Sequence, residues 1–379
     1  MIKINNKLTF DNMSSFINYV MKNNEEILVE KKYLDLYNFL KFYKKTKKDV
    51  LKQVNEFNNN ILNEENKIIR DLLSKFVYLN SDGKYLRACL IALGYNVYKN
   101  DNDYLPLSTA LEVFQTSILI HDDIIDKADK RRGKDTIPMQ YKKVTPACDK
   151  LNDFANSMAL CMGDLGFYLT SNVILDNYKN NPNLGTVLSY FNDMVIKTNK
   201  GEILDVYLSF MEKYNHIDNL EEKIFEIYTL KTSWYTVVGP FCLGLKLAGM
   251  NDIQNIEKVL IDVGIAFQIK DDLLGIYSDE LKTGKTASDV LEYKQTILYS
   301  YALNTSYKEE LLKYYGTDNT LKVAHIFEVS GAKKYAVDKM NELFDKSILG
   351  IKSLKLPDDT KSILTGFVEF LRGRDKWKS

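Results

Sequence analysis

The stretch LEVFQTSILIHDDIID, residues 111–126, is apolar along most of its length and ends in three aspartates. Side chains four residues apart lie on one face of an α-helix, so Phe114, Ile118, Asp122 and Asp126 form a single line. The carboxylates therefore continue the apolar face of the helix instead of its solvent face. A helix built for a protein core that ends in acidic side chains predicts a functional site at that end.

The composition is that of an ordinary globular protein, with 45% apolar and 27% charged residues and a formal net charge of zero. A neutral chain has no general attraction to nucleic acid or to anionic membranes, so we expect no nucleic-acid partner. The four cysteines show no CxxC spacing, which favours reduced thiols and a cytoplasmic protein. The N-terminus has no signal-peptide core, and no apolar stretch is long enough to predict a transmembrane segment.

Long segments of 3.6-residue apolar periodicity and only six prolines predict an all-α fold. Residues 1–75 alternate apolar and charged positions, which is typical of outer amphipathic helices, and residues 76–379 are expected to form the catalytic helical core. With no internal repeat and no long linker, both parts are expected to belong to one domain. The stretch RRGKDTIP, residues 131–138, is expected to be a loop.

The acidic residues Asp122, Asp123 and Asp126 predict a site for a hard divalent cation. Carboxylates one helical turn apart, about 5–6 Å between Cβ atoms, repel one another or take up protons when partly desolvated. Mg²⁺ removes this difficulty, because it binds a few carboxylates together with water and substrate phosphates. Arg131 and Arg132 follow closely and suit a diphosphate, since guanidinium groups pair with phosphate oxygens bidentately. A solvated, merely acidic helix end is the simpler alternative.

A second segment, FQIKDDLLGIYSDELKTGKTASD from Phe267, repeats the arrangement. Val259, Val263, Phe267 and Asp271 fall on one helical line, and Asp272 lies beside Asp271. Lys285 and Lys294 supply cations further along the chain. Two helices in which an apolar face ends in an aspartate pair indicate a functional site much more specifically than one such helix does.

Two smaller clusters are consistent with anion binding. In GKYLR, Lys84 and Arg87 are expected to share one face at the start of a helix. In LKTSWYT, Lys231 and Thr232 lie in a mostly apolar helix, where a lysine is expected to pair with an acidic group or to bind a ligand. Surface lysines and arginines with exposed head groups are the simpler alternative for both clusters.

These motifs, in this order, resemble those of the trans-isoprenyl diphosphate synthases, the group that includes farnesyl and geranylgeranyl diphosphate synthases. The resemblance covers roughly residues 80–300, with KGEILD at 200–205 and the basic LRGRDK at 371–376 as further matches. It implies an isoprenoid synthase-type helical bundle around a deep central cavity, a homodimer, and condensation of isopentenyl diphosphate with an allylic diphosphate.

The resemblance also assigns roles to residues at matching positions. The metal ligands would be Asp122, Asp123, Asp126, Asp271 and Asp272. They would hold Mg²⁺, three ions per active site, with Mn²⁺ able to substitute. Isopentenyl diphosphate would be bound by Gly83, Lys84, Arg87 and Arg132. The allylic diphosphate would be bound by Arg131, Lys231 and Lys285. Gln115 and Lys294 would be further substrate-binding residues. Lys231, Thr232 and Gln268 would flank the reacting carbon as catalytic residues.

Three positions depart from the family pattern. Gly275 stands where the second motif usually has a third aspartate, Glu202 stands where KGEILD would have a glutamine, and Asp82 stands where the family more often has a glycine. Because Asp271 is the residue expected on the metal, we expect activity to survive the first departure.

Chain length of the product is expected to depend on the residues before the first motif. Family members that stop at fifteen carbons commonly have large aromatic residues four and five positions before the motif, where this chain has Ile118 and Ser117. The hydrocarbon path should then continue to Phe114, about 5.4 Å further along the helix, which is room for one more isoprene unit. We therefore expect geranylgeranyl diphosphate as main product, with some farnesyl diphosphate. A floor at Ile118, giving fifteen carbons, is the alternative.

Other functions fit the sequence less well. A terpene cyclase would not need GKYLR, the arginine pair or the second motif. A non-catalytic partner subunit would be expected to have lost carboxylates or arginines, and almost all are present here. A ferritin-type metal bundle would need Glu-x-x-His pairs, and none of the three histidines has that spacing.

Overall fold

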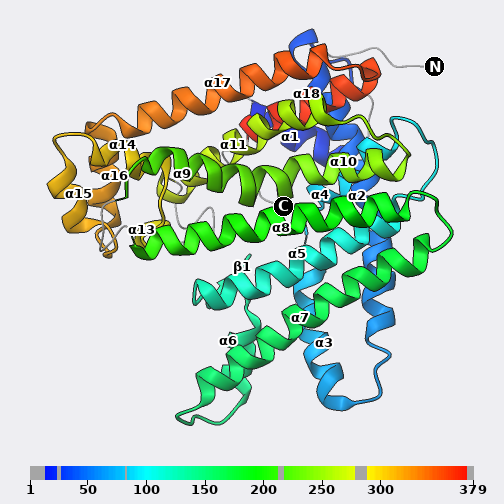
Figure 1. Ribbon diagram of the computed structural model, residues 1–379, viewed down its shortest axis with the longest axis horizontal. Helices are drawn as coiled ribbons and strands as arrows, with labels where there is room; N and C mark the ends of the chain where they lie inside the picture. Colours follow the sequence, from blue (N-terminus) through cyan, green and yellow to red (C-terminus); the bar gives the residue numbers. More distant parts are fainter. Residues whose placement is uncertain (1–12, 24–26, 82, 212–216, 278–287, 374–379) are drawn as a thin grey trace. The chain divides into compact units, whose positions relative to one another are not determined.

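The computed structural model describes residues 13–23, 27–81, 83–211, 217–277 and 288–373, and these residues are almost entirely helical (Figure 1). The all-α prediction is therefore confirmed. The helical segments are α1 Met13–Lys22, η1 Lys31–Tyr33, α2 Leu34–Ile61, α3 Lys67–Asn80, α4 Leu86–Tyr95, α5 Leu105–Ile125, α6 Ile137–Val144, α7 Leu151–Tyr178, α8 Leu184–Met211, α9 Leu220–Ile227, η2 Tyr228–Val238, α10 Gly239–Leu247, α11 Gln254–Tyr277, α13 Ser288–Leu291, α14 Ile297–Leu303, α15 Lys308–Tyr314, α16 Thr320–Val329, α17 Ala332–Ser353 and α18 Asp358–Arg372.

The chain divides into two compact units. Unit 1 comprises Met1–Lys44, Tyr190–Cys242 and Asn251–Ser379, and unit 2 comprises Lys45–Ser189 and Leu243–Met250. The first acidic motif lies in unit 2, and the second lies in unit 1. The expected subdivision of the chain at residue 75 stays a prediction.

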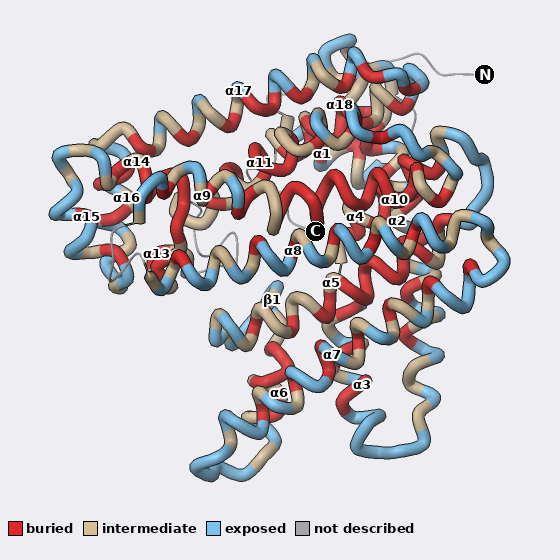
Figure 2. The backbone as a smooth tube through the Cα atoms, viewed as in Figure 1, coloured by how far each residue is buried: buried red, intermediate tan, exposed pale blue. Residues whose placement is uncertain are grey.

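Helix α5 is the central element of unit 2 and is buried along most of its length (Figure 2). It packs along α7 and also contacts α4 and α3. The contact with α7 is close because Gly166 has no side chain: a Cβ there would lie 2.0 Å from Ser117 Oγ. Apolar residues of α3, α5, α6 and α7 fill the core around this contact, namely Leu72, Leu73, Phe76, Val113, Ile120, Ile137, Tyr141, Ala155, Ala159 and Met162.

Two short strands interrupt the helices of unit 2. β1 (Lys130–Arg131) and β2 (Lys134–Asp135) pair antiparallel, with Lys130 opposite Asp135 and Arg131 opposite Lys134. The expectation of a loop over residues 131–138 is wrong at this point. The two turn residues, Arg132 and Gly133, have φ values of +54° and +79°. Positive φ at both central residues is the geometry of the two-residue hairpin turn that matches strand twist.

Unit 1 is built around α11, which packs against η2 and α17. The N-terminal part of α2 packs on α18 through Phe39, whose ring lies 5.5 Å from that of Phe367 and 5.3 Å from that of Phe370. Helix η2 is a π-helix of eleven residues and carries Lys231 and Thr232. π-Helical turns are rare and occur frequently at functional sites, so this segment warrants close inspection.

Among the described residues, α7 is the one helix long and apolar enough to cross a membrane by length and composition. Only 33% of its apolar window is buried, and a single helix of this kind is weak evidence for a membrane span. The structure therefore gives no clear transmembrane segment.

Candidate active site

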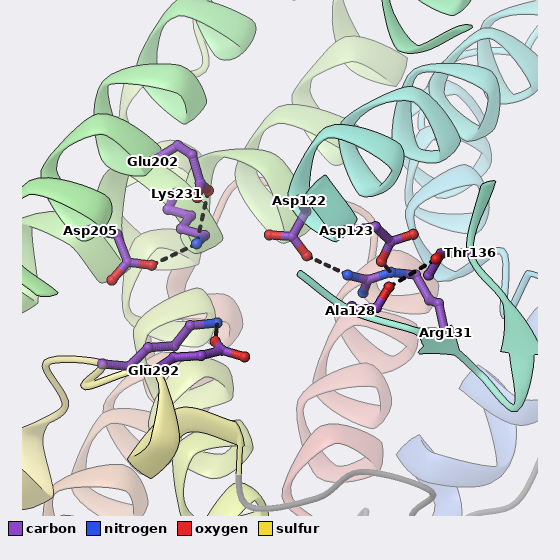
Figure 3. Close-up of polar contacts among 10 residues, drawn as sticks. Asp122, Asp123, Ala128, Arg131, Thr136, Glu202, Asp205, Lys231 and Glu292 are labelled. Atoms are coloured by element: carbon purple, nitrogen blue, oxygen red, sulfur yellow. Dashed lines mark hydrogen bonds and ion pairs between the residues drawn. The ribbon is translucent and has the colours of Figure 1, made fainter. Parts of the chain in front are cut away.

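The first acidic motif forms an ion-pair cluster at the C-terminal end of α5 (Figure 3). Arg131, on β1, donates from Nη2 to Asp122 Oδ2 at 2.5 Å and from Nε to Asp123 Oδ1 at 2.5 Å. Asp126 is the C-cap of the helix and donates its backbone N–H to the carbonyl of Asp122. The hairpin therefore returns a guanidinium group to the carboxylates that precede it in the sequence.

Asp123 differs from Asp122 in its surroundings. Its side chain is 1% exposed, against 20% for Asp122. Its Oδ2 atom has no hydrogen-bond partner in the described part of the chain. Burial raises the pKa of Asp123 to about 6, although Arg131 acts in the opposite direction. Asp122 and Asp126 are accordingly better suited than Asp123 to hold a metal ion.

A pocket in unit 2 lies beside this cluster and is lined by Leu79, Asn80, Gly83, Glu112, Gln115, Thr116, Leu119, Arg131, Arg132 and Lys134. With its amide carbonyl facing the two guanidinium groups, Gln115 accepts from Arg87 Nη1 and Arg132 Nη2, both at 3.3 Å. The structure thus brings Gly83, Arg87, Gln115 and Arg132 together, as the sequence predicted. Several N–H donors around one pocket can bind a diphosphate bidentately.

The expectation that Lys84 and Arg87 share one helical face is wrong. Helix α4 begins at Leu86, and Tyr85 at its N-cap has a left-handed backbone with φ of +56°. Arg87 therefore lies in the first turn of the helix, whereas Lys84 precedes it in an irregular segment. Periodicity could not reveal a left-handed residue between them.

Sequence reasoning missed Glu112, a carboxylic acid in the lining of this cationic pocket. It is 5% exposed, and its Oε1 atom has no hydrogen-bond partner among the described residues. Burial raises its pKa to about 7, against the attraction of Arg87, Arg132 and Lys47. In the sequence, the position of Glu112 one helical turn before Gln115 was the one indication that it could lie near this pocket.

In unit 1, two glycines hold the segment that carries Lys231. A Cβ on Gly201 of α8 would lie 2.4 Å from the backbone nitrogen of Lys231, and a Cβ on Gly264 of α11 would lie 2.3 Å from Ser233 Cα. Such distances are below any real Cβ contact, so η2 can lie between α8 and α11 only because both positions are glycine.

This packing brings Lys231 against two carboxylates of α8 (Figure 3). Its Nζ lies 2.6 Å from Asp205 Oδ2 and 2.8 Å from Glu202 Oε2. The positive charge of this partly exposed lysine is thereby balanced by two carboxylates. Asp205 was not predicted, although its spacing of three from Glu202 puts both on one helical face.

The second acidic motif ends in a chain of hydrogen bonds instead of an ion pair. The Tyr228 hydroxyl and Gln268 Nε2 donate to the two oxygens of Asp272, the latter at 2.8 Å. Thr232 Oγ1 donates to Gln268 Oε1 at 2.6 Å. Asp272 is 4% exposed, and burial raises its pKa to about 7, although both donors favour the charged form.

The two predicted metal ligands of this motif therefore differ. Asp271 is partly exposed. Asp272 is buried, with both oxygens bonded to protein groups. Tyr228 was missed altogether, because nothing in the sequence relates it to a residue forty-four positions away.

The glycine at position 275 also has a structural explanation. A Cβ there would lie 2.5 Å from Asp289 Oδ2, so a side chain at this position would require the carboxylate of Asp289 to shift. Nearby, Lys294 Nζ lies 3.0 Å from Glu292 Oε2. Lys285 lies outside the described residues.

The three predicted chain-length residues lie in two environments. Phe114 packs against Phe167 of α7 with ring centres 5.4 Å apart, and Ser117 is fully buried against Gly166. Both belong to the contact between α5 and α7. Ile118 is only partly buried, one turn before Asp122. The chain-length roles expected for these three positions stay predictions.

The family model of the polyprenyl synthetases matches residues 67–330. The chain is 28% identical over 279 residues to a short chain isoprenyl diphosphate synthase of Methanocaldococcus jannaschii, covering 72% of this chain and 78% of that protein. It is 26% identical over 330 residues to a geranylgeranyl diphosphate synthase of Sulfolobus acidocaldarius, covering 78% and 94%. Among solved structures, the geranylgeranyl pyrophosphate synthase of Corynebacterium glutamicum, complexed with isoprenyl diphosphate and magnesium, superposes with a TM-score of 0.79 at 22% identity, covering 87% of this chain and 99% of that one.

The chain therefore belongs to the polyprenyl synthetase family. It is a prenyltransferase of the short-chain isoprenyl diphosphate synthase type, and its fold is the helical fold of that family. The resemblance inferred from the ordered motifs is confirmed. The central cavity expected between the two acidic motifs stays a prediction.

Proposed function

We propose that the protein condenses isopentenyl diphosphate with dimethylallyl, geranyl and farnesyl diphosphates, and that geranylgeranyl diphosphate is its main product, with farnesyl diphosphate as a second product. The observation that carries the reaction is the pocket of unit 2 beside the acidic end of α5, which Gln115 and Arg132 line and where Gln115 also accepts from Arg87. A cationic pocket next to carboxylates suits two diphosphate groups, one held by arginine and one held through a metal.

Isopentenyl diphosphate would be held by the arginine pocket. Arg87 and Arg132 offer N–H donors in fixed planes, which suits diphosphate oxygens better than flexible ammonium groups do. Gln115 joins the two guanidinium groups and keeps them from separating. The left-handed turn at Arg132 and Gly133 fixes the direction of one of them.

The carboxylates of the first motif suit magnesium. In the part of the chain that the structure describes, no three acidic, histidine or cysteine side chains converge into a ready-made metal site. Mg²⁺ usually binds one or two carboxylates and completes its shell with water and substrate phosphates, so Asp122 and Asp126 fit it without a third protein ligand. When bound, Mg²⁺ would supply positive charge for the leaving diphosphate.

In the reaction, the allylic C–O bond breaks and its electron pair leaves with the diphosphate. The double bond of isopentenyl diphosphate then forms the new C–C bond, and the released diphosphate takes up the proton that is lost. Lys231 would stabilise the leaving group. Thr232 and Gln268 would face the positively charged carbon with oxygen atoms.

The product length is inferred from Ile118. It is partly buried, of medium size and on the same helical line as Asp122, which supports a hydrocarbon path that continues beyond this residue. An enzyme that stops at fifteen carbons is the second candidate, in which Ile118 itself closes the path.

Sizing the products made from labelled isopentenyl diphosphate, Mg²⁺ and each allylic starter would test both parts. Twenty-carbon chains are expected to predominate. Ile118→Phe should shift the product to fifteen carbons, while Ile68→Phe, at a 73% exposed position on α3, should leave it unchanged. Fifteen-carbon chains without any twenty-carbon chains from the unaltered protein would contradict the proposed product, and no condensation at all would exclude the function.

We also propose that the protein is a homodimer. Helix α8 carries a row of exposed apolar side chains, Ile196, Ile203, Val206, Tyr207 and Phe210. Their spacing puts them on one helical face, and a contiguous apolar surface of this kind marks a protein contact. Sedimentation equilibrium of the unaltered protein should give twice the chain mass of 43.8 kDa. The Ile203→Asp variant should have the mass of a single chain. A monomeric unaltered protein would contradict the proposal. A non-catalytic partner subunit is not favoured, because almost all the carboxylates and arginines of the motifs are present.

A further inference from the structure

In the buried hydrogen-bond network around Asp272, the backbone N–H of Ile297 determines which group donates and which accepts in the next bond. The backbone N–H of Ile297, in the first turn of α14, donates to Tyr228 Oη at 3.0 Å. Amide nitrogen can only donate, so the tyrosine oxygen accepts there and its own proton must point elsewhere. That proton goes to Asp272 Oδ2.

The carboxyl group of Asp272 determines which end of the Gln268 amide faces it. Gln268 turns its NH₂ group, and not its carbonyl, toward Asp272 Oδ1, which accepts this hydrogen bond at 2.8 Å while Oδ2 accepts from Tyr228. The carbonyl of the same amide then faces Thr232. With the amide reversed, its carbonyl oxygen would lie against the carboxylate, and the charge-assisted hydrogen bond would be lost.

The last step concerns the hydroxyl of Thr232. Because Gln268 presents an acceptor, Thr232 gives its proton to Gln268 Oε1 at 2.6 Å. The lone pairs of Thr232 Oγ1 remain, and they carry the negative end of the hydroxyl dipole. A reversed amide would donate to Thr232 instead and turn the hydroxyl proton outward, toward any cation beside it.

We propose that Asp272 and Tyr228 are positioning residues, which hold Gln268 and Thr232 in the one hydrogen-bond orientation that presents oxygen lone pairs, and not a proton, to a positively charged carbon. This inference rests on the proposed function, because it needs a substrate that ionises. It assigns Asp272 a role other than the metal ligand suggested by its motif.

The two roles of Asp272 predict different behaviour of Asp272→Asn. An asparagine offers both a donor and an acceptor, so Gln268 loses its fixed orientation while the volume is conserved. The positioning role predicts a fall in kcat of about 10- to 100-fold, the range for removing a group that orients a functional side chain. The KM for isopentenyl diphosphate and the Mg²⁺ concentration for half-maximal rate should be unchanged. A large rise in the Mg²⁺ requirement would instead show a metal ligand and overturn the proposal.

A binding measurement tests the same point without turnover. Two unreactive allylic diphosphate analogues are compared by calorimetry in the presence of Mg²⁺, one with a cationic nitrogen at the reacting carbon and one with neutral carbon there. The unaltered protein should prefer the cationic analogue. Asp272→Asn should lose this preference by about 10-fold or more, with little change for the neutral analogue. An unchanged preference would contradict the proposal.

Tyr228→Phe provides a second variant, since it removes the donor to Asp272 without altering charge. It should reduce kcat and the preference for the cationic analogue in the same direction, by a smaller factor. The matched controls are Tyr277→Phe and Asp262→Asn, both on α11, whose side chains bond to Ala324 O and Lys346. Both controls should behave as the unaltered protein.

The outcomes separate this inference from the proposed function. If the unaltered protein fails to condense isopentenyl diphosphate and binds neither analogue, the proposed function fails and this inference fails with it. If the unaltered protein is active and both variants keep its kcat and its binding preference, the function stands and the positioning role is wrong.

Discussion

The two acidic motifs have the same sequence pattern and different internal chemistry. In unit 2, Asp122 and Asp123 share one guanidinium group, that of Arg131. In unit 1, Asp272 is surrounded by neutral donors, Tyr228 and Gln268. An apolar helical line that ends in an aspartate pair therefore predicts a site, but it does not predict what the second aspartate of the pair does.

The difference follows from what neutralises each buried charge. Burial raises the pKa of both carboxyl groups, to about 6 for Asp123 and to about 7 for Asp272. An arginine supplies opposite charge and strong hydrogen bonds, whereas a hydroxyl and an amide supply hydrogen bonds alone. The ion-paired motif suits binding of charge, and the neutral network suits orientation of dipoles.

The largest effect should come from removing the exposed acid of the ion-paired motif. Asp122→Ala should reduce turnover by about 10³-fold or more, because it removes a candidate metal ligand for the leaving diphosphate. Lys231→Ala, in the other unit, should also reduce turnover by orders of magnitude. Steady-state kinetics would measure both, with thermal unfolding as a check on folding. Asp176→Ala, at an exposed site on α7, is the control. Unchanged turnover in both variants would refute the assigned site.

Stability measurements should separate the two motifs directly. Arg131→Gln leaves Asp123 buried without its cation, which typically costs about 3–5 kcal/mol. Tyr228→Phe removes the hydrogen bond to Asp272 and the acceptor of the Ile297 N–H, and should cost about 1–3 kcal/mol. Denaturant unfolding at pH 8 would measure both. Equal losses would mean that the two networks do not differ as described.

A third carboxyl group, Glu112, should give unit 2 a pH dependence of its own. Its pKa is about 7 in the folded protein against a usual 4.5, so between these values the folded state holds a proton that the unfolded state has lost. The free energy of unfolding should therefore fall as pH rises through this range, by about 3 kcal/mol for this group.

Glu112→Gln removes that contribution. Relative to the unaltered protein, the variant should become more stable by about 3 kcal/mol between pH 4.5 and pH 8. Comparing denaturant unfolding of both proteins across this range isolates the contribution of Glu112 from those of Asp123 and Asp272. Parallel pH profiles would show that Glu112 is ionised throughout.

The smallest effect concerns Lys231, which is held by two carboxylates in unit 1. Because Glu202 and Asp205 compete with a diphosphate for the same ammonium group, Glu202→Gln should free it in part. The KM for the allylic substrate should fall by about 3-fold, which corresponds to about 0.6 kcal/mol. The KM for isopentenyl diphosphate should not change. A higher KM for the allylic substrate would mean that Glu202 helps to position Lys231.

Sequence periodicity predicted the all-α fold and placed Asp122 at the end of an apolar helical face, because residues on one helix have fixed directions relative to one another. The family resemblance pointed to Gly83, Gln115, Arg131 and Arg132, four of the residues that line the unit 2 pocket. Periodicity failed for Lys84, because Tyr85 has a left-handed backbone and helix α4 begins only after it. Periodicity also could not show that Ser117 packs against Gly166, because that glycine belongs to another helix, forty-nine positions later.

The sequence by itself determined the two acidic motifs, the cations that follow them and the family to which the chain belongs, since these depend on local spacing and residue type. Only the tertiary structure decided that Asp123 meets an arginine, that Asp272 meets a tyrosine, and that Glu112 is buried among cations. The physical reason is that desolvation and hydrogen-bond partners come from residues far away in the chain. The same carboxyl group is a ligand, an ion-pair partner or a dipole anchor according to those neighbours.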